Sequence, residues 1–431
     1  MESPAEDHSA GGRARYEWRV GVEYSAFDRE RFVTETHSSK RGDFQRDRGR
    51  IIHSSALRRL AQKTQVLSPT SGVDFARNRL THSLEVAQVG REIAQRLGLD
   101  PDVVDGACLA HDLGHPPFGH NGESAISAWA GSIGGFEGNA QTFRVLTKLE
   151  SKVADSSGVS RGLNLSRASL DAASKYPWGR DAAVVEEGGR EKFGVYTDDR
   201  EVFDWLRHGL PEREVSIEAQ VMDLADDIAY SVHDFEDAIV GGFIEPAGLV
   251  EWGEESVSAV NWEGQHIAAD ELRGAFGRLR DMPTWPPTFT GERASFAQLK
   301  NFTSSAIGRF AQTVSVVERG VGDALSGRYR FGLFVPVETQ AEIAVLKSVV
   351  ATAVMKHETR QPIYAHQREV LVSLLDTLVK TGSQHLEPMY EADFAEAAGD
   401  EERTRVIVDQ VASLTDQSAL AWHERLVGSW G

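Results

Sequence analysis

Apolar residues recur at helical spacing along most of this chain, and the two-residue alternation typical of half-buried strands is sparse. In the segment 79–97 one helix face collects Leu84, Val86, Val89, Ile93, Ala94 and Leu97. The same spacing predicts helices at residues 50–65, 79–97, 102–113, 120–130, 139–153, 198–208, 221–240, 270–280, 339–357 and 364–380. The sequence therefore predicts an all-α fold.

Stretches rich in polar and turn-forming residues divide the chain into regions. Residues 1–15 are polar, and we expect a disordered tail there. Residues 16–240 are assigned to a core domain with a lid or insertion near 155–197, because Ser156–Arg167 is rich in Ser and Gly. Residues 241–431 are expected to form a C-terminal helical region packed on that core.

The composition is that of an ordinary soluble globular protein, with 41% of the 431 residues hydrophobic and 26% charged. No apolar run approaches the roughly 18 residues of a membrane span, and the N-terminus lacks the basic and apolar regions of a signal peptide. We therefore expect a cytoplasmic protein with no membrane partner. The one cysteine, Cys108, excludes an internal disulfide and a zinc cluster built on cysteines.

The formal net charge of -19 disfavours a general coat for nucleic acids, because the field of the whole molecule repels polyanions. Basic residues nevertheless gather between Lys40 and Arg79. Two interpretations stay open, since such a run is most often a solvated face, but a polyphosphate pocket also needs several cationic donors. Binding of single-stranded DNA through this segment is a secondary hypothesis.

The stretch LAHDLGHPPFGHNGE, residues 109–123, concentrates three histidines and two carboxylates. His111 and Asp112 end an apolar helical run, where an imidazole and a carboxylate can share one cation. Gly114 is expected to stop that helix. A single His-Asp pair is a weak signal, because buried histidines are usually core residues, so other ligands must support a metal site.

Two prolines follow in the same stretch and enforce an extended turn. A new helix can begin near Gly119, which places His120 and Glu123 three residues apart on its first turn. This spacing is typical of a general acid and the carboxylate that orients it. The alternative is a histidine that only stabilises the turn by a hydrogen bond.

Two further segments carry candidate ligands. His82 lies near the start of the amphipathic helix 79–97, from which it could face His111. In the helical run 221–240, Asp226, Tyr230 and Asp234 recur every four residues and so form one stripe. Polar groups on an inward stripe need partners, and a metal or a bound ligand would supply them.

The order of a histidine, a His-Asp pair and a distant aspartate resembles the HD-domain metal phosphohydrolases. Within that superfamily, successive motifs resemble the deoxyguanosine triphosphate triphosphohydrolase family and occur in its order: RGRIIHSSALRRLAQKTQV (48–66), RLTHSLEV (79–86), HDLGHPPFGHNGE (111–123), FEGNAQTFRVL (136–146), SKYPW (174–178), EKFG (191–194) and DLADDIAYSVHD (223–234). The resemblance covers residues 40–240 strongly and 403–426 more loosely. It implies an all-α HD-domain core with an additional C-terminal helical region.

Matched residue by residue, the resemblance implies four metal ligands: His82, His111, Asp112 and Asp226. Two imidazoles and two carboxylates leave positions open for water and substrate, as catalysis requires. Asp227 stands beside Asp226, and the residues alone do not choose between them. The cofactor expected is a divalent metal, with Mg or Mn favoured and Fe or Zn also compatible with these ligands.

The implied reaction is hydrolysis of dGTP, or also of other dNTPs, at the α-phosphorus to a deoxynucleoside and inorganic triphosphate. His120 would act as general acid with Glu123 orienting it, and His115 would donate a hydrogen bond to the α-phosphate. The resemblance assigns substrate contacts to six further residues, namely Gln65, Arg79, Lys175, Lys192, Tyr230 and Asp234. Of these, Tyr230 and Asp234 would read the sugar, and the cationic residues would bind phosphates.

The family resemblance also implies partners: a dNTP substrate, a dNTP activator and further copies of the chain, with a hexamer as one arrangement. Two alternatives remain. An HD-domain nucleotidase or phosphodiesterase would release a shorter phosphate, and a non-catalytic nucleotide sensor or single-stranded DNA binder would keep the pocket for ligand only. The reaction product distinguishes a nucleotidase or phosphodiesterase from a triphosphohydrolase. Loss of a catalytic residue would indicate the non-catalytic sensor or DNA binder. Residues 245–335 match no motif and leave the substrate preference open.

Overall fold

The computed structural model describes residues 21–36, 40–65, 77–186, 189–249, 260–262, 265–320, 325–355 and 361–428. Helices dominate these ranges, and the strands are short, which confirms the predicted all-α class. The tail predicted at residues 1–15 lies outside the described residues.

Four helices form the centre of the molecule: α2 (Asp43–Ile52), α4 (Arg79–Leu97), α5 (Pro101–Ala110) and α10 (Ile217–Val240). The helix α4 begins where the Asn78 side chain accepts a hydrogen bond from the Thr81 amide, and it ends at Gly98, whose φ is 80°. Its face is buried as predicted except at Leu84, which is 50% exposed. Helices α12 (Ala269–Arg280), α13 (Arg293–Thr313) and α14 (Val337–Val350) cover one side of this centre.

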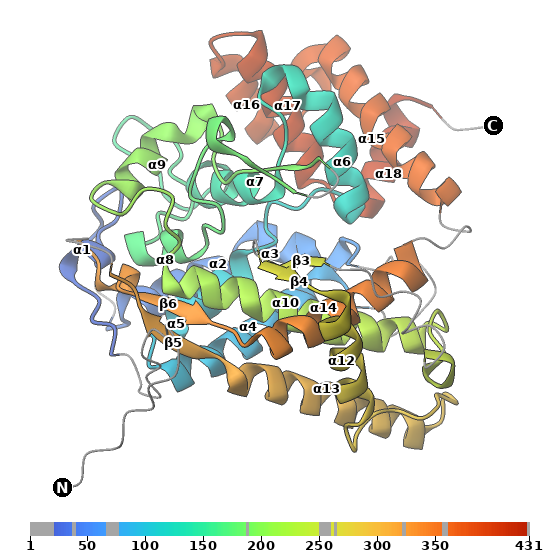
Figure 1. Cartoon of the computed structure of the whole chain (residues 1–431). Helices are drawn as coiled ribbons and strands as arrows, with labels where there is room; N and C mark the ends of the chain where they lie inside the picture. The colour runs from blue at the N-terminus through green and yellow to red at the C-terminus, as the bar shows by residue number, and fades with distance from the viewer. Residues whose placement is uncertain are drawn as a thin grey trace, which may run out of the picture.

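A second group of helices lies across the centre from α13 (Figure 1). It consists of α6 (Gly119–Trp129), α15 (Gln361–Thr381), α16 (Pro388–Glu396), α17 (Asp400–Ser413) and α18 (Asp416–Leu426). The helix α6 follows α5 in the chain but packs against α15. The C-terminal helices therefore contact the segment that carries the predicted catalytic histidines.

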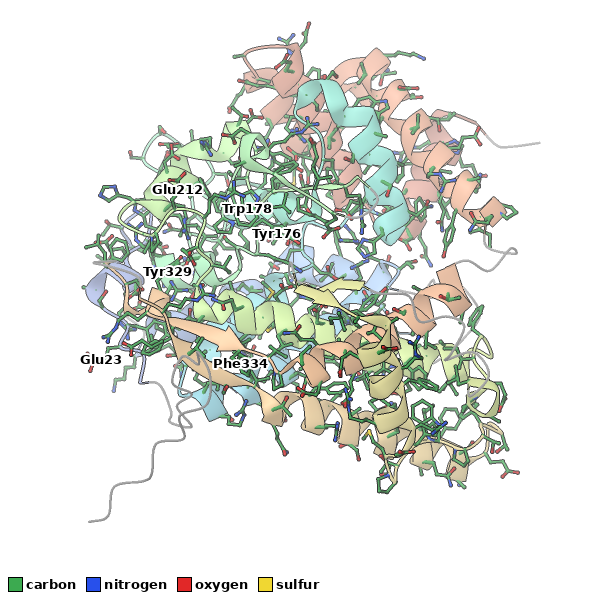
Figure 2. The ribbon with its side chains drawn as sticks, in the orientation of Figure 1. Glu23, Tyr176, Trp178, Glu212, Tyr329 and Phe334 are labelled. Atoms are coloured by element: carbon green, nitrogen blue, oxygen red, sulfur yellow. The ribbon has the colours of Figure 1, made fainter. Side chains whose placement is uncertain are left out.

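Several short helices complete the described part of the fold. They are α1 (Ala26–Arg29), α3 (Ser55–Arg59), α7 (Gly138–Arg144), α8 (Arg167–Ala172) and α9 (Arg200–Arg207). Antiparallel pairs join β1 (Val184–Val185) to β2 (Glu191–Lys192), β3 (Val260–Trp262) to β4 (Gln265–Ile267), and β5 (Ser315–Glu318) to β6 (Phe331–Phe334). In the last pair, Val316 lies opposite Leu333. The segment predicted as a lid or insertion contains α8 and the pair β1–β2, and Figure 2 shows its Tyr176 and Trp178 side by side.

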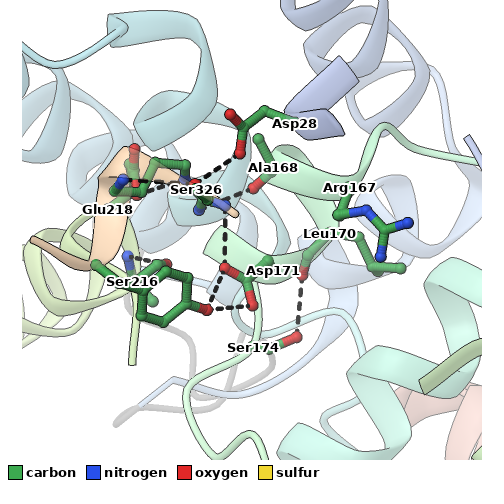
Figure 3. Close-up of polar contacts among 12 residues, drawn as sticks. Asp28, Arg167, Ala168, Leu170, Asp171, Ser174, Ser216, Glu218 and Ser326 are labelled. Carbon is green, nitrogen blue, oxygen red and sulfur yellow. Dashed lines mark hydrogen bonds and ion pairs between the residues drawn. The ribbon is translucent and has the colours of Figure 1, made fainter. Parts of the chain in front are cut away.

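A buried ionic network attaches the β5–β6 hairpin to the core (Figure 3). Arg328 is fully buried between Asp171 and Glu218, at 3.0 Å and 2.9 Å from their carboxylates. The Ser326 hydroxyl donates to Asp28 at 2.7 Å. The Arg328 charge thus faces two carboxylates, and Asp28 is held by a hydroxyl hydrogen bond, as burial demands.

Two helices predicted from the sequence differ from the structure. The helix predicted at 50–65 is interrupted, because α2 ends at Ile52 and the Ser54 hydroxyl caps α3. The helix predicted to stop at Gly114 ends at Ala110. A Cβ on Gly114 would lie 2.1 Å from the Thr142 amide nitrogen, so this glycine permits close backbone packing and does not cap a helix. The sequence analysis also missed α13 and the β5–β6 hairpin.

Candidate metal centre and active site

Three helices bring the four predicted metal ligands together. His82 lies on the first turns of α4 and is 1% exposed, His111 is the residue that caps α5 at its C-terminus, and Asp226 lies in the middle of α10. The imidazole rings of His82 and His111 have centroids 5.6 Å apart. Residues widely separated in the sequence thus converge at the contact between α4, α5 and α10.

The distances within this cluster are those of potential ligands to one ion. Asp226 Oδ1 lies 2.9 Å from His82 Nε2 and 3.6 Å from His111 Nε2. Asp112 Oδ2 lies 3.6 Å from the same nitrogen of His111. Ligand atoms of His82, His111 and Asp112 all fall within 4.8 Å of one another. One cation could therefore be reached from both imidazoles and both carboxylates.

The hydrogen bonds of His111 fit a metal ligand. Its Nδ1 donates to the Cys108 carbonyl oxygen at 2.6 Å, which fixes the tautomer and leaves Nε2 with a lone pair. That Nε2 is buried and has no hydrogen-bond partner among the described residues. A buried nitrogen without a partner is costly unless a ligand satisfies it, so the donor set fits a divalent metal.

Both carboxylates of the cluster are held in the ionised form. Burial by itself would raise the pKa of Asp112, but the Arg79 guanidinium and then His111 hold it well below its ordinary value. Arg79 donates to Asp112 Oδ2 at 2.5 Å. The pKa of Asp226 is likewise lowered against the effect of burial by His111 and His82. Ionised carboxylates are the form that binds a cation.

A second cluster of His115, His120 and Glu123 lies beside the first. The rings of His115 and His120 have centroids 5.0 Å apart, and His115 Nδ1 is 3.8 Å from Asp112 Oδ1. His115 is buried, and its pKa is lowered well below the ordinary value by burial and then by Arg79. A neutral His115 still offers one N–H, and its Nε2 has no protein partner in the described part of the chain.

His120 has the geometry of a proton donor directed at solvent. Its Nδ1 lies 3.1 Å from Glu123 Oε2, and its side chain is 51% exposed. The other oxygen of Glu123 accepts from the Gly138 amide at 3.1 Å. Despite burial, the hydrogen bond from His120 keeps the pKa of Glu123 well below its ordinary value, so an ionised carboxylate orients this ring.

The predicted phosphate-binding lysines are already paired with carboxylates. Lys192 Nζ donates to Glu137 Oε1 at 3.0 Å and lies 3.9 Å from Glu123. Lys175 pairs with Asp223, one turn before Asp226 on α10. Both lysines therefore stand next to the two clusters, and their role with phosphate stays a prediction.

The predicted sugar-reading residues differ in accessibility. Tyr230 is half-buried, whereas Asp234 is fully buried, and neither carboxylate oxygen of Asp234 has a hydrogen-bond partner in the described residues. Burial, and then the neighbouring Asp237, raise the pKa of Asp234 well above its ordinary value. Gln65 is half-buried near the start of α6, with its backbone oxygen 4.0 Å from where a Cβ on Gly119 would lie.

Lys347 is a further cation that the sequence analysis did not single out. It extends from α14 to pair with Asp227, and its Nζ lies 5.7 Å from the centre of the Tyr230 ring. Asp227 is therefore directed at Lys347, whereas Asp226 is directed at His82 and His111. The helix pattern at 339–357 assigned α14 to core packing and gave no signal for a lysine that reaches the site.

The basic segment from Lys40 to Arg79 does not converge on the metal ligands as a whole. Arg48 pairs with Asp105 and Arg50 with Glu35, while Arg79 contacts Asp112. Part of this segment lines a cavity of about 840 Å³. The cavity is also lined by Glu35, Thr36, residues 149–153, Leu163, Glu387, Met389 and Tyr390. Its lining includes none of the predicted site residues.

No helix in the described part of the chain is long and apolar enough to cross a membrane.

Two family models match the chain: the HD domain over residues 79–231 and the phosphohydrolase-associated domain over residues 333–425. The first match contains all four predicted metal ligands, and the second contains most of the C-terminal helices.

Similar proteins cover almost the whole chain. A deoxyguanosinetriphosphate triphosphohydrolase-like protein of Bifidobacterium longum is 50% identical over 413 residues, which span 94% of this chain and 87% of that protein. A protein of the same description from Streptomyces coelicolor is 50% identical, and the match spans 89% of this chain and 92% of that protein. Another from Vibrio campbellii is 32% identical, and the match spans 96% of this chain and 99% of that protein. The chain thus belongs to the deoxyguanosinetriphosphate triphosphohydrolase-like family of HD-domain proteins.

Proposed function

We propose that this protein is a metal-dependent triphosphohydrolase that cleaves dGTP, and also other dNTPs, at the α-phosphorus. The observation that carries the proposal is the adjacency of two clusters. One gathers His82, His111, Asp112 and Asp226 as ligands, and the other offers the hydrogen-bonded pair His120 and Glu123 beside it. The family membership supports the same chemistry.

A divalent cation held by the first cluster would supply a water nucleophile at neutral pH and offset phosphate charge. The chain's own residues do the rest. His120, oriented by ionised Glu123, gives a proton to the departing 5′-oxygen, and the N–H of buried His115 donates to the α-phosphate. Arg79 fixes Asp112 through its hydrogen bond and therefore keeps that carboxylate directed at the ligand cluster.

Substrate recognition is assigned to the residues around Tyr230. Its ring beneath the sugar would leave no room for a 2′-hydroxyl, which would select deoxyribose. Asp234 would accept from the 3′-hydroxyl, and this hydrogen bond would satisfy a carboxylate that lacks a partner among the described residues. Lys175 and Lys192 would exchange their present carboxylate partners for the triphosphate.

The test is to incubate the purified protein with dGTP or GTP, each with Mg²⁺ or Mn²⁺, and to separate all products by ion-exchange chromatography. Equimolar deoxyguanosine and inorganic triphosphate, with GTP intact, is the expected result. Release of orthophosphate or a monophosphate would replace the proposal by a nucleotidase or phosphodiesterase. A mixture of four dNTPs supplies an activator, and lack of cleavage in that mixture would indicate a sensor.

A further inference from the structure

The turn between α5 and α6 is held by a carboxylate from the opposite end of the chain. Asp416, the first residue of α18, is 4% exposed. Its Oδ1 accepts a hydrogen bond from the Phe118 amide at 2.9 Å. Its Oδ2 accepts from the Thr64 amide at 3.0 Å and from the Thr64 hydroxyl at 2.5 Å. One buried carboxylate thus connects the turn before α6, the segment before α4 and the C-terminal helices.

A second buried charge repeats this connection. The Lys63 ammonium donates to the His115 carbonyl oxygen at 2.5 Å and to the Ala412 carbonyl oxygen at 2.9 Å. Ala412 lies in the last turn of α17, next to the junction with α18. Both ends of the turn 115–118 are therefore linked to α17 and α18 through buried charged side chains: His115 through Lys63, which also bonds Ala412, and Phe118 through Asp416.

The turn needs such support because its backbone is strained. Phe118, which precedes α6, has a φ of 65°, and Gly119, the first residue of α6, has a φ of 60°, so two consecutive residues are left-handed where this helix begins. A side chain as large as phenylalanine rarely adopts this conformation, which persists only where surrounding contacts determine it. The N-terminus of α6 has no side-chain cap of its own. The hydrogen bond from the Phe118 amide to Asp416 holds the backbone of this residue from outside the turn, while its side chain packs in the hydrophobic core.

We propose that Asp416 is a positioning residue for catalysis: it fixes the left-handed Phe118 and thereby the direction in which the first turn of α6 presents His120 and Glu123. The inference rests on the proposed function for the role of those two residues. Asp416 itself contacts neither the metal ligands nor His120. It gives the C-terminal helices a part in the chemistry that is separate from packing.

The variants Asp416→Ala and Asp416→Asn test the proposal, because alanine removes all three hydrogen bonds and asparagine retains one acceptor in the same shape. The matched control is Asp400→Asn, since Asp400 is likewise the first residue of a C-terminal helix but has a 99% exposed side chain. A misplaced catalytic group can cost about 10²-fold in rate. We therefore expect kcat to fall roughly 10²-fold in the alanine variant and about 10-fold in the asparagine variant, with KM within about 2-fold.

Equilibrium Mn²⁺ content per chain, measured by elemental analysis, is expected to stay unchanged in all three variants. An unchanged kcat in folded Asp416→Ala, or an equal loss in Asp400→Asn, would overturn the proposal. So would a loss confined to the metal content or to the folded fraction, because that would reduce Asp416 to a structural residue.

A readout without nucleotide separates this inference from the proposed function. In Mg²⁺-containing buffer, the ¹³Cε1 NMR signals of His115 and His120, assigned by single substitution, are expected to move in Asp416→Asn and to stay in place in Asp400→Asn. If the wild type cleaves no dNTP, the proposed function fails, but the NMR comparison still tests the positioning. Unmoved signals in folded Asp416→Asn would refute the positioning even in an active enzyme.

Discussion

His82 Nε2 lies 2.9 Å from Asp226 Oδ1, although 144 positions separate these residues in the chain. The neighbouring Asp227 turns away and pairs with Lys347. The geometry therefore predicts that Asp226→Asn abolishes metal binding and lowers kcat on the order of 10³-fold or more, as expected for loss of a residue on which the reacting centre depends. Asp227→Asn is expected to retain both the metal and most of the activity. Elemental analysis and dGTP cleavage of the two variants measure this, and equal metal loss would reject Asp226 as the selective ligand.

Removal of the proposed general acid separates chemistry from metal binding. His120→Gln is expected to lower kcat by about 10²- to 10⁴-fold, the usual contribution of a positioned acid or base, while the metal content stays unchanged. His53, an exposed histidine at the C-terminus of α2, provides the control His53→Gln. An activity within about 3-fold of wild type in His120→Gln would assign that histidine to the turn rather than to proton transfer.

Glu123 makes stability depend on pH. Burial raises its pKa, but the hydrogen bond from His120 and the neighbouring His115 and Lys192 bring the folded-state value well below the ordinary 4.5. A carboxyl with a lower pKa in the folded state stabilises the protein fully above the unfolded-state pKa, and this contribution is lost as the pH falls through the folded-state value. The difference in unfolding free energy between wild type and Glu123→Gln should therefore be largest above pH 4.5 and shrink below it.

Urea unfolding in a series of buffers from neutral to acidic pH measures this difference. The exposed Glu369 on α15 supplies the control Glu369→Gln, which should track the wild type at every pH. A difference that grows as the pH falls would contradict the stated direction of the Glu123 pKa.

Tyr230 is predicted to determine sugar selection. Tyr230→Ala should lower the ratio of kcat/KM for dGTP to that for GTP by about 10-fold or more, because the cavity left by the ring accommodates a 2′-hydroxyl. Tyr230→Phe keeps the ring and should keep the preference. A competition assay with dGTP and GTP measures this preference. An unchanged preference in Tyr230→Ala would show that Tyr230 does not determine sugar selection.

The sequence predicted those elements whose signals are local. The helix α4 was predicted at its observed bounds from its apolar period, and the Asn78 cap and Gly98 that delimit it in the structure adjoin the same segment. The helix α13 was missed although Leu299, Phe302, Ala306 and Phe310 have helical spacing and are buried, so a signal was present there.

Other features have no local signal. The bond from Phe118 to Asp416 joins residues 298 positions apart, and nothing in the sequence near either one indicates it. The convergence of His82 with Asp226 was predicted from the family resemblance, because periodicity places each residue on a helix face but does not pair the faces.

The buried network around Arg328 supplies a prediction about stability alone. Its guanidinium is fully buried and pairs with Asp171 and Glu218. Arg328→Met would leave the buried Glu218 without its cation, whereas Asp171 would keep its pair with Arg207 at 2.8 Å. Breaking a buried pair in this way costs about 3–5 kcal/mol. Arg330, two residues later, is 62% exposed and pairs with Glu318 at 3.3 Å, so Arg330→Met should cost about 0–1 kcal/mol. Denaturant unfolding of both variants measures the contrast, and similar losses would mean that the carboxylates find other partners or take up protons when the arginine is removed.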